Sequence, residues 1–328
     1  DVVSVTARDS GSVLGLYADN TQAVRRGQLL IEFDPIKAQV AYDAAKADLA
    51  RTVRSTRTDF SKVNTARAQL ESARVALSQA QSDLRRRASA GESVSREEVS
   101  HARDAVSGAQ AAVRAAESNL AEAEATVQGT EIHNNPDVLS AIARLRQASI
   151  TLAHMFIRAP VDGVIAQRSA QIGQQIAAGT PLMAVVPLDD VWIDANFKES
   201  QLVDMRVGQP VTVTADIYGS GVTYHGHVEG LGAGSGSAFA LLPPQNATGN
   251  WIKIVQRVPV RIALDPKDVR DHPLRVGLSV DVSVDISDTS GSLMGSLKPL
   301  RNLRGDPGDG GGPALEAEIR DILTQNGG

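Results

Sequence analysis

The sequence lacks cysteine, long apolar runs and clustered basic charge, and each absence excludes a class of protein. Without cysteine, the 328-residue chain forms no disulfides and no thiolate metal sites. It contains no run of 18 apolar residues, hence no candidate transmembrane helix, and no signal peptide. The net charge is −5, and no basic stripe is interleaved with aromatic residues, which argues against a nucleic-acid partner.

The sequence also lacks an initiator methionine. It begins at Asp1, directly in a strand-like segment, so we interpret it as a processed or truncated fragment. With 42% apolar residues the chain is expected to fold, and its length suits two or three domains.

The longest pattern present is helical and occupies residues 36–156. Apolar residues from Val99 to Val127 recur at alternating spacings of three and four, and an earlier run from Ala66 to Leu84 keeps the same spacing. Such a seam is typical of two helices packed together. Residues 88–95 between the runs are rich in turn formers, and Ser95 opens a capping-box pattern. The sequence therefore predicts an antiparallel helical hairpin with its tip at about residues 88–95.

Charge and length support this hairpin. Residues 36–90 carry 11 Lys and Arg against 5 Asp and Glu, whereas residues 91–135 carry 3 against 8, so the two helices attract each other. A first helix of about 50 residues spans roughly 75–80 Å, which is the length of a spacer. Gly129 to Pro136 interrupts the returning helix, and a further helix is expected to run to Phe156.

Residues 157–188 repeat residues 1–35 at one offset of 152, without a gap. Turn glycines align with turn glycines and strand positions with strand positions. The matched pairs are Val5 with Ile157, Ala7 with Ala159, Gly11 with Gly163, Val13 with Ile165, Val24 with Ile176, Gly27 with Gly179, Leu30 with Leu182, Phe33 with Val185 and Pro35 with Pro187. Each half-unit is too small to bury a core alone, so the two are predicted to pair into one small β-sandwich.

Residues 189–287 have an all-β pattern, with one helical turn from Lys198 to Met205. The expected strands are Val191–Phe197, Val211–Ala215, Tyr224–Leu231, Trp251–Val255, Val258–Leu264 and Leu278–Ile286. Short antiparallel strands in this number predict a small closed barrel. The loop from residue 232 to 250 is long for such a barrel and is predicted to be a contact element. Its candidate contact residues, with the start of the next strand, are Phe239, Leu241, Gln245, Asn246 and Trp251.

Residues 288–328 form a tail rich in Gly and Pro, which we expect to be flexible. Residues 313–325 within it are predicted as one short amphipathic helix. Its apolar face carries Leu315, Ile319, Ile322 and Leu323. This helix is either a docking peptide or a non-native addition, and the sequence does not separate the two.

No set of residues has the spacing of a catalytic site, so the protein is predicted not to be an enzyme, and no cofactor is expected. His225 and His227 share one face of a strand, but no third ligand falls at metal spacing. The glycine-rich loop at residues 230–236 matches neither a phosphate-binding loop nor a dinucleotide fingerprint.

Several runs of the sequence resemble those of a known family. The first half-unit ending in Gly27–Pro35, the coiled-coil insert and the run Ile157–Ile165 resemble the membrane fusion proteins, or periplasmic adaptors, of the HlyD family. The runs Pro181–Pro187, Val191–Glu199 and Leu241–Trp251 resemble the EmrA-like branch, which works with major-facilitator drug pumps. The resemblance covers about residues 3–286.

The resemblance implies a multidomain α+β fold: a split lipoyl-like β-sandwich, a long antiparallel α-helical coiled-coil hairpin and a small β-barrel. It also implies a non-enzymatic adaptor in the periplasm of a Gram-negative bacterium, held at the inner membrane by an N-terminal anchor. The partners implied are an EmrB-like major-facilitator transporter, a TolC-like outer-membrane channel and further copies of the chain in a ring, a trimer or a hexamer. The alternative is the adaptor of an ABC-driven type I protein secretion system; a structural coiled-coil scaffold is a third reading.

In this family the hairpin tip meets the channel, often through an Arg, a Leu four residues on and a Ser seven further. Here Ser95 matches the serine and Val94 an apolar position before it, but Leu84 and Ala88 occupy the other two positions. Arg85, Arg86 and Arg87 either substitute as a docking patch or form a solvated helix end. Lipoyl carriers present a lysine on the tight turn between their halves. Lys37 has no such turn and no flanking Met, so carrier function is rejected.

Overall fold

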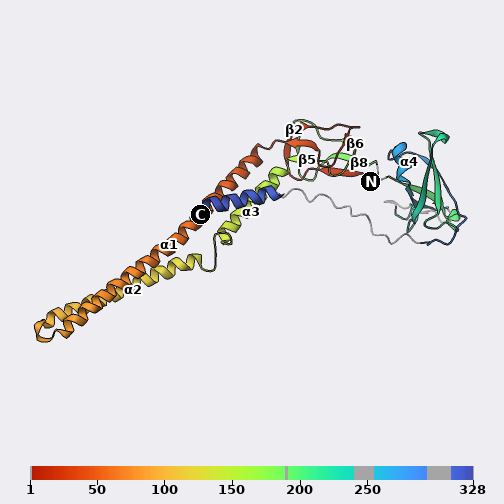
Figure 1. Cartoon of the computed structure of the whole chain (residues 1–328). Helices are drawn as coiled ribbons and strands as arrows, with labels where there is room; N and C mark the ends of the chain where they lie inside the picture. The colour runs from red at the N-terminus through yellow and green to blue at the C-terminus, as the bar shows by residue number, and fades with distance from the viewer. Residues whose placement is uncertain (1, 189–190, 240–254, 294–311, 328) are drawn as a thin grey trace, which may run out of the picture. The chain divides into compact units, whose positions relative to one another are not determined.

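The computed structural model describes residues 2–188, 191–239, 255–293 and 312–327 (Figure 1). The chain divides into two compact units. One comprises Asp1–Phe33 with Phe156–Asp306, and the other comprises Asp34–Met155 with Pro307–Gly328. Within the described residues, no helix is both long and apolar enough to cross a membrane.

Eight short strands from the two halves of the repeat form the β-sandwich. The first half contributes β1 (Val3–Thr6), β2 (Gly11–Leu16), β3 (Ala23–Val24) and β4 (Leu29–Phe33). The second half contributes β5 (Phe156–Arg158), β6 (Gly163–Arg168), β7 (Gln175–Ile176) and β8 (Pro181–Val186). The strands form two four-stranded sheets, in the orders β1-β8-β6-β3 and β5-β4-β2-β7.

The two sheets are equivalent under the predicted repeat. Exchanging each strand for its counterpart 152 residues away converts one sheet order into the other. The linking hydrogen bonds repeat as well: the Ala7 amide donates to Thr180 O at 2.9 Å, and the Ala159 amide donates to Gln28 O at 2.9 Å. Every sheet thus contains strands from both halves, so neither half completes a sheet alone.

The core of the sandwich is apolar and draws on both halves. Phe33, Leu30, Ile165 and Leu182 are almost completely buried. The neighbouring strands β6 and β8 of one sheet approach closely at Gly163, where an added Cβ would lie 2.5 Å from the carbonyl oxygen of Val186. Glycine is therefore required at residue 163, because any side chain there would clash with the backbone of the neighbouring strand.

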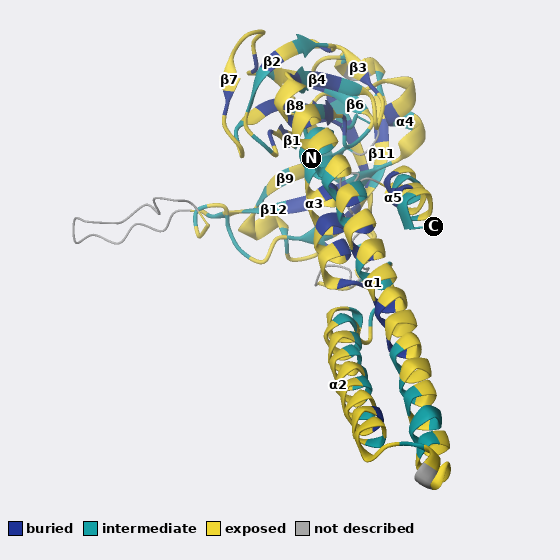
Figure 2. Ribbon diagram, turned by 90° about the vertical axis from the view of Figure 1, so that its left-hand side faces the viewer, coloured by how far each residue is buried: buried dark blue, intermediate teal, exposed yellow. Residues whose placement is uncertain are grey.

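The hairpin consists of α1 (Ile36–Ser89, 54 residues) and α2 (Arg96–Val127). At ~1.5 Å per residue, α1 is about 80 Å long. Figure 2 shows the stripe of less exposed residues along both helices. Every predicted seam position in α1 and α2 is buried or half-buried, and among these Ala66, Leu70 and Ala102 are buried. Two helices cover each other on one side only, which explains why most of the seam stays half-exposed.

The predicted break is present. α2 ends at Val127, Gly129 has a φ of +72°, and α3 (Pro136–Ala153) starts with Pro136 in its first turn. Asn135 caps α3 by accepting a hydrogen bond from the Asp137 amide at 2.9 Å. The expectation that this helix runs to Phe156 is wrong. α3 ends at Ala153, because Phe156 pairs as a strand residue with Glu32 of β4.

The barrel region contains β9 (Trp192–Lys198), β10 (Pro210–Ala215), β11 (Thr223–Leu231), β12 (Arg257–Leu264) and β13 (Val280–Val284). All pair antiparallel in the order β13-β10-β11-β12-β9, around a core that includes Tyr224, Val228 and Ile262. Three short 3-10 turns occur in the described chain, at Gly91–Ser93, Glu199–Gln201 and Gly219–Gly221. The strand expected at residues 251–255 lies almost wholly outside the described residues. With the hairpin and the sandwich, this region confirms the predicted fold class.

Two further helices remain, one within the barrel region and one in the second compact unit. The short helix α4 (Pro266–Asp271), which the sequence analysis did not predict, follows β12 and is capped by Asp265. The helix expected in the tail is α5 (Gly312–Gly327), with Leu315, Ile319 and Ile322 buried. α5 packs against α1 and α3, as part of the same compact unit.

Candidate functional site: the hairpin tip

The tip is a tight, hydrogen-bonded connection between α1 and α2. The Ala90 amide donates to Arg87 O at 3.3 Å and the Val94 amide to Gly91 O at 3.3 Å. Gly91 has a φ of +59°, a left-handed conformation that glycine adopts without strain. Because the backbone of the turn is bonded in this way, the tip has a defined shape.

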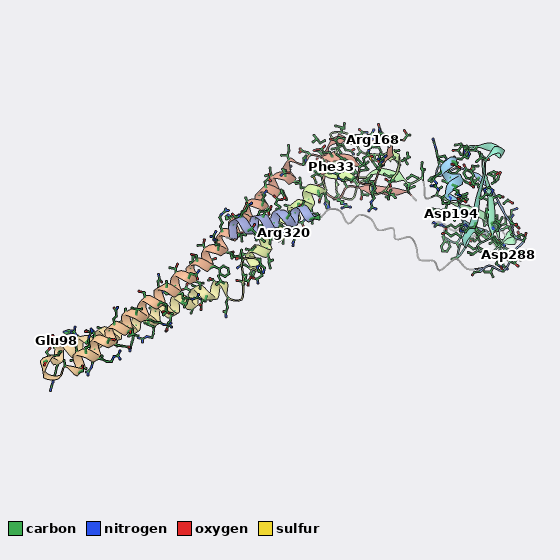
Figure 3. The ribbon with its side chains drawn as sticks, viewed as in Figure 1. Phe33, Glu98, Arg168, Asp194, Asp288 and Arg320 are labelled. Carbon is green, nitrogen blue, oxygen red and sulfur yellow. The ribbon has the colours of Figure 1, made fainter. Side chains whose placement is uncertain are left out.

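Ser95 starts α2 through the predicted capping box. Its hydroxyl accepts from the Glu98 amide at 3.2 Å, while the Ser95 amide donates to Glu98 Oε2 at 2.9 Å. The hydroxyl also donates to Glu98 Oε2 at 3.1 Å. The polar atoms of Ser95 are thus engaged within the chain, and Figure 3 labels Glu98 at the end of the hairpin.

The pKa of Glu98 is lowered from its ordinary value of 4.5, chiefly because the Ser95 amide and hydroxyl donate to its carboxylate, with a smaller contribution from the Arg87 charge. A carboxyl group with a lowered folded-state pKa stabilises the fold most fully above its unfolded pKa. That contribution is lost as the pH falls through the lowered folded value. The capping box should therefore hold at neutral pH and loosen only under strongly acidic conditions.

We expect Ser95→Ala to lower the hydrogen-exchange protection of the Glu98 amide about fivefold at pH 7, since an N-cap contributes roughly 1 kcal/mol. Ser95→Thr keeps the capping oxygen and should retain most of the protection. Amide exchange measured by NMR at neutral pH and near pH 3 would check both. Equal protection in the two variants would contradict the role of the cap.

The three arginines before the tip do not form one free patch. Arg86 Nη2 lies 3.2 Å from Asp83 Oδ1 and Arg87 Nε lies 2.9 Å from Asp83 Oδ2, while Arg85 donates to Ser82 Oγ at 3.2 Å. Arg86 and Arg87 also occupy the last turn of α1, where positive charge favours the helix dipole. Their ion pairs are exposed, so their guanidinium groups remain within reach of a partner.

Val94 is half-buried and extended, directly before the capping serine. The structure thus brings all five predicted tip residues to one end of the hairpin: Arg85, Arg86, Arg87, Val94 and Ser95. Sequence reasoning missed Asp83, which pairs with two of the arginines. The i,i+3 and i,i+4 spacing of an acid and bases on one helix was the available signal.

The barrel loop is the second candidate contact. Of its predicted residues, Leu241, Gln245, Asn246 and Trp251 lie outside the described residues. Phe239 is described and is 75% exposed. Its ring lies against Gly234, where an added Cβ would be 2.8 Å from Phe239 Cε2. One face of this large apolar side chain is therefore supported while the rest contacts solvent.

His225 and Lys37 lie outside any cluster of functional groups in the described residues. His225 bonds to Asp268 through its amide at 2.8 Å and its Nδ1 at 3.0 Å, which ties β11 to α4. These contacts, the amide first, lower the pKa of Asp268. Lys37 is an exposed residue in the first turn of α1. Among the residues that the structure describes, no three His, Asp or Glu side chains gather as metal ligands would.

Comparison of the sequence with known proteins assigns the chain to a family. A family model described as "EMRA, alpha-helical hairpin domain" matches residues 37–154, and one described as "AAEA-like beta-barrel domain" matches residues 190–285. The fatty acid resistance protein FarA of Neisseria gonorrhoeae is 51% identical over 289 residues, which cover 87% of this chain and 73% of FarA. The chain belongs to the EmrA family.

The multidrug export protein EmrA of Escherichia coli is 45% identical to this chain over 294 residues, which cover 89% of this chain and 75% of EmrA. The resemblance to multidrug-export membrane fusion proteins is therefore confirmed. A solved structure of the periplasmic adaptor protein EmrA matches 87% of this chain and 94% of that chain, with 19% identity and a TM-score of 0.40.

Proposed function

We propose that this EmrA-family chain is a non-enzymatic periplasmic adaptor in tripartite multidrug efflux. The observation that carries the proposal is the 54-residue helix α1, paired with α2 and closed by a capped turn. An element of this length and composition performs no chemistry, but it can bridge two partners that are far apart. The names of the relatives, multidrug export protein and fatty acid resistance protein, support export of toxic compounds.

The adaptor would be anchored at the inner membrane, where it works with an EmrB-like major-facilitator transporter. The transporter supplies the energy from the proton gradient, and the adaptor completes a sealed conduit to a TolC-like channel in the outer membrane. A closed conduit requires several copies in a ring, a trimer or a hexamer. The AAEA-like barrel and the multidrug-export relatives favour this pump branch over type I protein secretion.

In this proposal the hairpin tip docks on the channel. Val94 supplies apolar contact, and the exposed Arg85 and Arg86 with the half-buried Arg87 supply charge. Ser95 mainly shapes the turn, because its hydroxyl is bonded to Glu98. Phe239 and its neighbours in the barrel loop would contact the transporter, the drug or a neighbouring copy.

The test is accumulation of a fluorescent hydrophobic dye in a gene-deletion strain. Deletion should raise accumulation, and wild type should reverse it. Val94→Asp and Ser95→Arg should each fail to restore efflux, because one places a charge in the apolar contact and the other removes the cap and adds bulk. Ser95→Thr, which keeps the cap, is the matched control and should restore most of it.

Two outcomes would count against the proposal. Full efflux with Val94→Asp would remove the tip from the channel contact. Unchanged dye levels on deletion, in a strain without redundant pumps, would favour the secretion alternative. A comparison of secreted proteins in the two strains would then decide.

A further inference from the structure

The tail helix α5 lies in an apolar groove on the second compact unit. Its residues Leu315, Ile319 and Ile322 recur at i, i+4 and i+7 and form one buried face. This face packs on a cluster drawn from α1 and α3, whose members are Leu49, Val53, Val138, Ala141, Ile142 and Leu145. Three apolar anchors at helical spacing are the signature of a helix bound in a groove.

The rim of the groove is charged, and its charges complement α5. Glu318 pairs with Lys46 and accepts from the Tyr42 hydroxyl, both on α1. Burial and the nearby Glu318 raise the pKa of Tyr42 to about 12, so its hydroxyl remains a donor at neutral pH. On the other side, Arg146 of α3 donates to Glu316 Oε1 from Nε at 3.0 Å and from Nη2 at 2.8 Å.

The far end of α5 reaches the break between α2 and α3. Ile132, within the break, packs against the same cluster. An added Cβ on Gly327 would lie 3.6 Å from Ile132 Cγ2, and Arg54 of α1 donates to Asn326 Oδ1 at 2.7 Å. α5 therefore touches α1, the break and α3, which are the three parts whose arrangement sets the direction of the distal hairpin.

We propose that α5 is a helical clamp, bound in a groove of its own chain, that holds the break at residues 128–135 in one conformation. The groove selects an amphipathic helix with acidic residues on its polar edges. Residues 294–311 join α5 covalently to the rest of the chain, so α5 is at a high local concentration near its groove. The clamp does not depend on the transport role of the protein.

Neighbouring residues of α5 supply a matched pair of variants. Ile319 is buried in the groove, whereas Arg320, labelled in Figure 3, is exposed. Ile319→Asn should release α5 and raise hydrogen exchange of the amides at residues 129–145 about tenfold or more, because these amides then open locally. Arg320→Asn should leave their exchange unchanged. Equal exchange in the two variants would overturn the clamp.

A charge reversal keeps the proposal testable if Ile319→Asn misfolds. Arg146→Glu should raise exchange in the break about two- to fivefold, as expected for loss of an exposed ion pair. Adding Glu316→Arg should restore the wild-type rate. Failure of the double variant to restore it, with the single variant impaired, would mean that this pair does not hold α5.

Cross-linking can show whether α5 binds the groove of its own chain or that of a second copy. Engineered cysteines can be used for this, because the chain has no cysteine of its own. A Lys46→Cys, Glu318→Cys double variant treated with a short bismaleimide should cross-link within one chain. The two single variants, mixed in equal amounts, should give no cross-linked dimer. A dimer in that mixture would show that α5 docks on a second copy and would overturn the same-chain clamp.

Discussion

Replacing Val113 with proline should abolish drug efflux while the barrel stays folded. Val113 lies in the middle of α2, on the seam that faces α1. Proline there removes a backbone hydrogen bond and clashes with the preceding turn, at a cost of about 3 kcal/mol or more. The seam has little burial to offset this cost, because most of its positions are half-exposed.

The measurement combines dye efflux with two spectroscopic probes. Helix content by far-UV circular dichroism should fall. The tryptophan fluorescence should not change, because the two tryptophans of the sequence, Trp192 and Trp251, both fall within residues 190–285, which match the barrel family model. Trp192 is a good reporter, since Arg261 stacks over its ring at 4.1 Å. Val113→Ala, which keeps the backbone intact, is the control and should retain most efflux. Undiminished efflux with proline would refute the proposed conduit role of the hairpin.

Replacing Phe33 with alanine should unfold the β-sandwich at ordinary temperature or bring it close to unfolding. Phe33 is completely buried, and its side chain packs where Gly11 of the opposing strand segment leaves space. Deleting a buried phenylalanine costs about 3–5 kcal/mol through lost burial and the cavity left behind. Because each sheet contains strands from both halves, the damage should spread to the second half of the repeat.

The readout is hydrogen exchange of peptides from residues 163–168 and 181–186, which belong to the other half. Both should lose protection in Phe33→Ala. Leu14→Ala is the control, because Leu14 is 56% exposed and surface substitutions usually change stability by about 0.5 kcal/mol or less. Protected peptides in Phe33→Ala would mean that the two halves fold independently.

The sequence predicted best those elements whose residue pattern repeats at a regular spacing. The seam from Val99 to Val127 repeats at the helical spacing, and the two half-units repeat at one offset, so both patterns exceed what chance produces. Local signals were also enough to predict the helix starts at Ser95 and Pro136. Ser95 caps its helix through its side chain, and the fixed φ of Pro136 suits the first turn of a helix. The tip residues were found together because they are close in sequence.

The sequence-based predictions were wrong where contacts with residues distant in the chain determine the secondary structure. Phe156 continues a helical pattern, yet its pairing with Glu32, 124 positions earlier in the chain, makes it a strand residue. α4 is only six residues long and depends on contacts with β11, such as Asp268 to His225. Short segments have little intrinsic preference, so tertiary contacts override it.

By itself, the sequence determined the classes of element and their order: a split β unit, a long hairpin with a capped tip, and a barrel. These follow from periodicity, turn chemistry and charge, which act between neighbours in the chain. Only the tertiary structure decided how strands of the two halves pair within each sheet and where α5 binds. Leu315, Ile319 and Ile322 indicate an apolar face, but the face that covers them is built from α1 and α3, which meet only after folding.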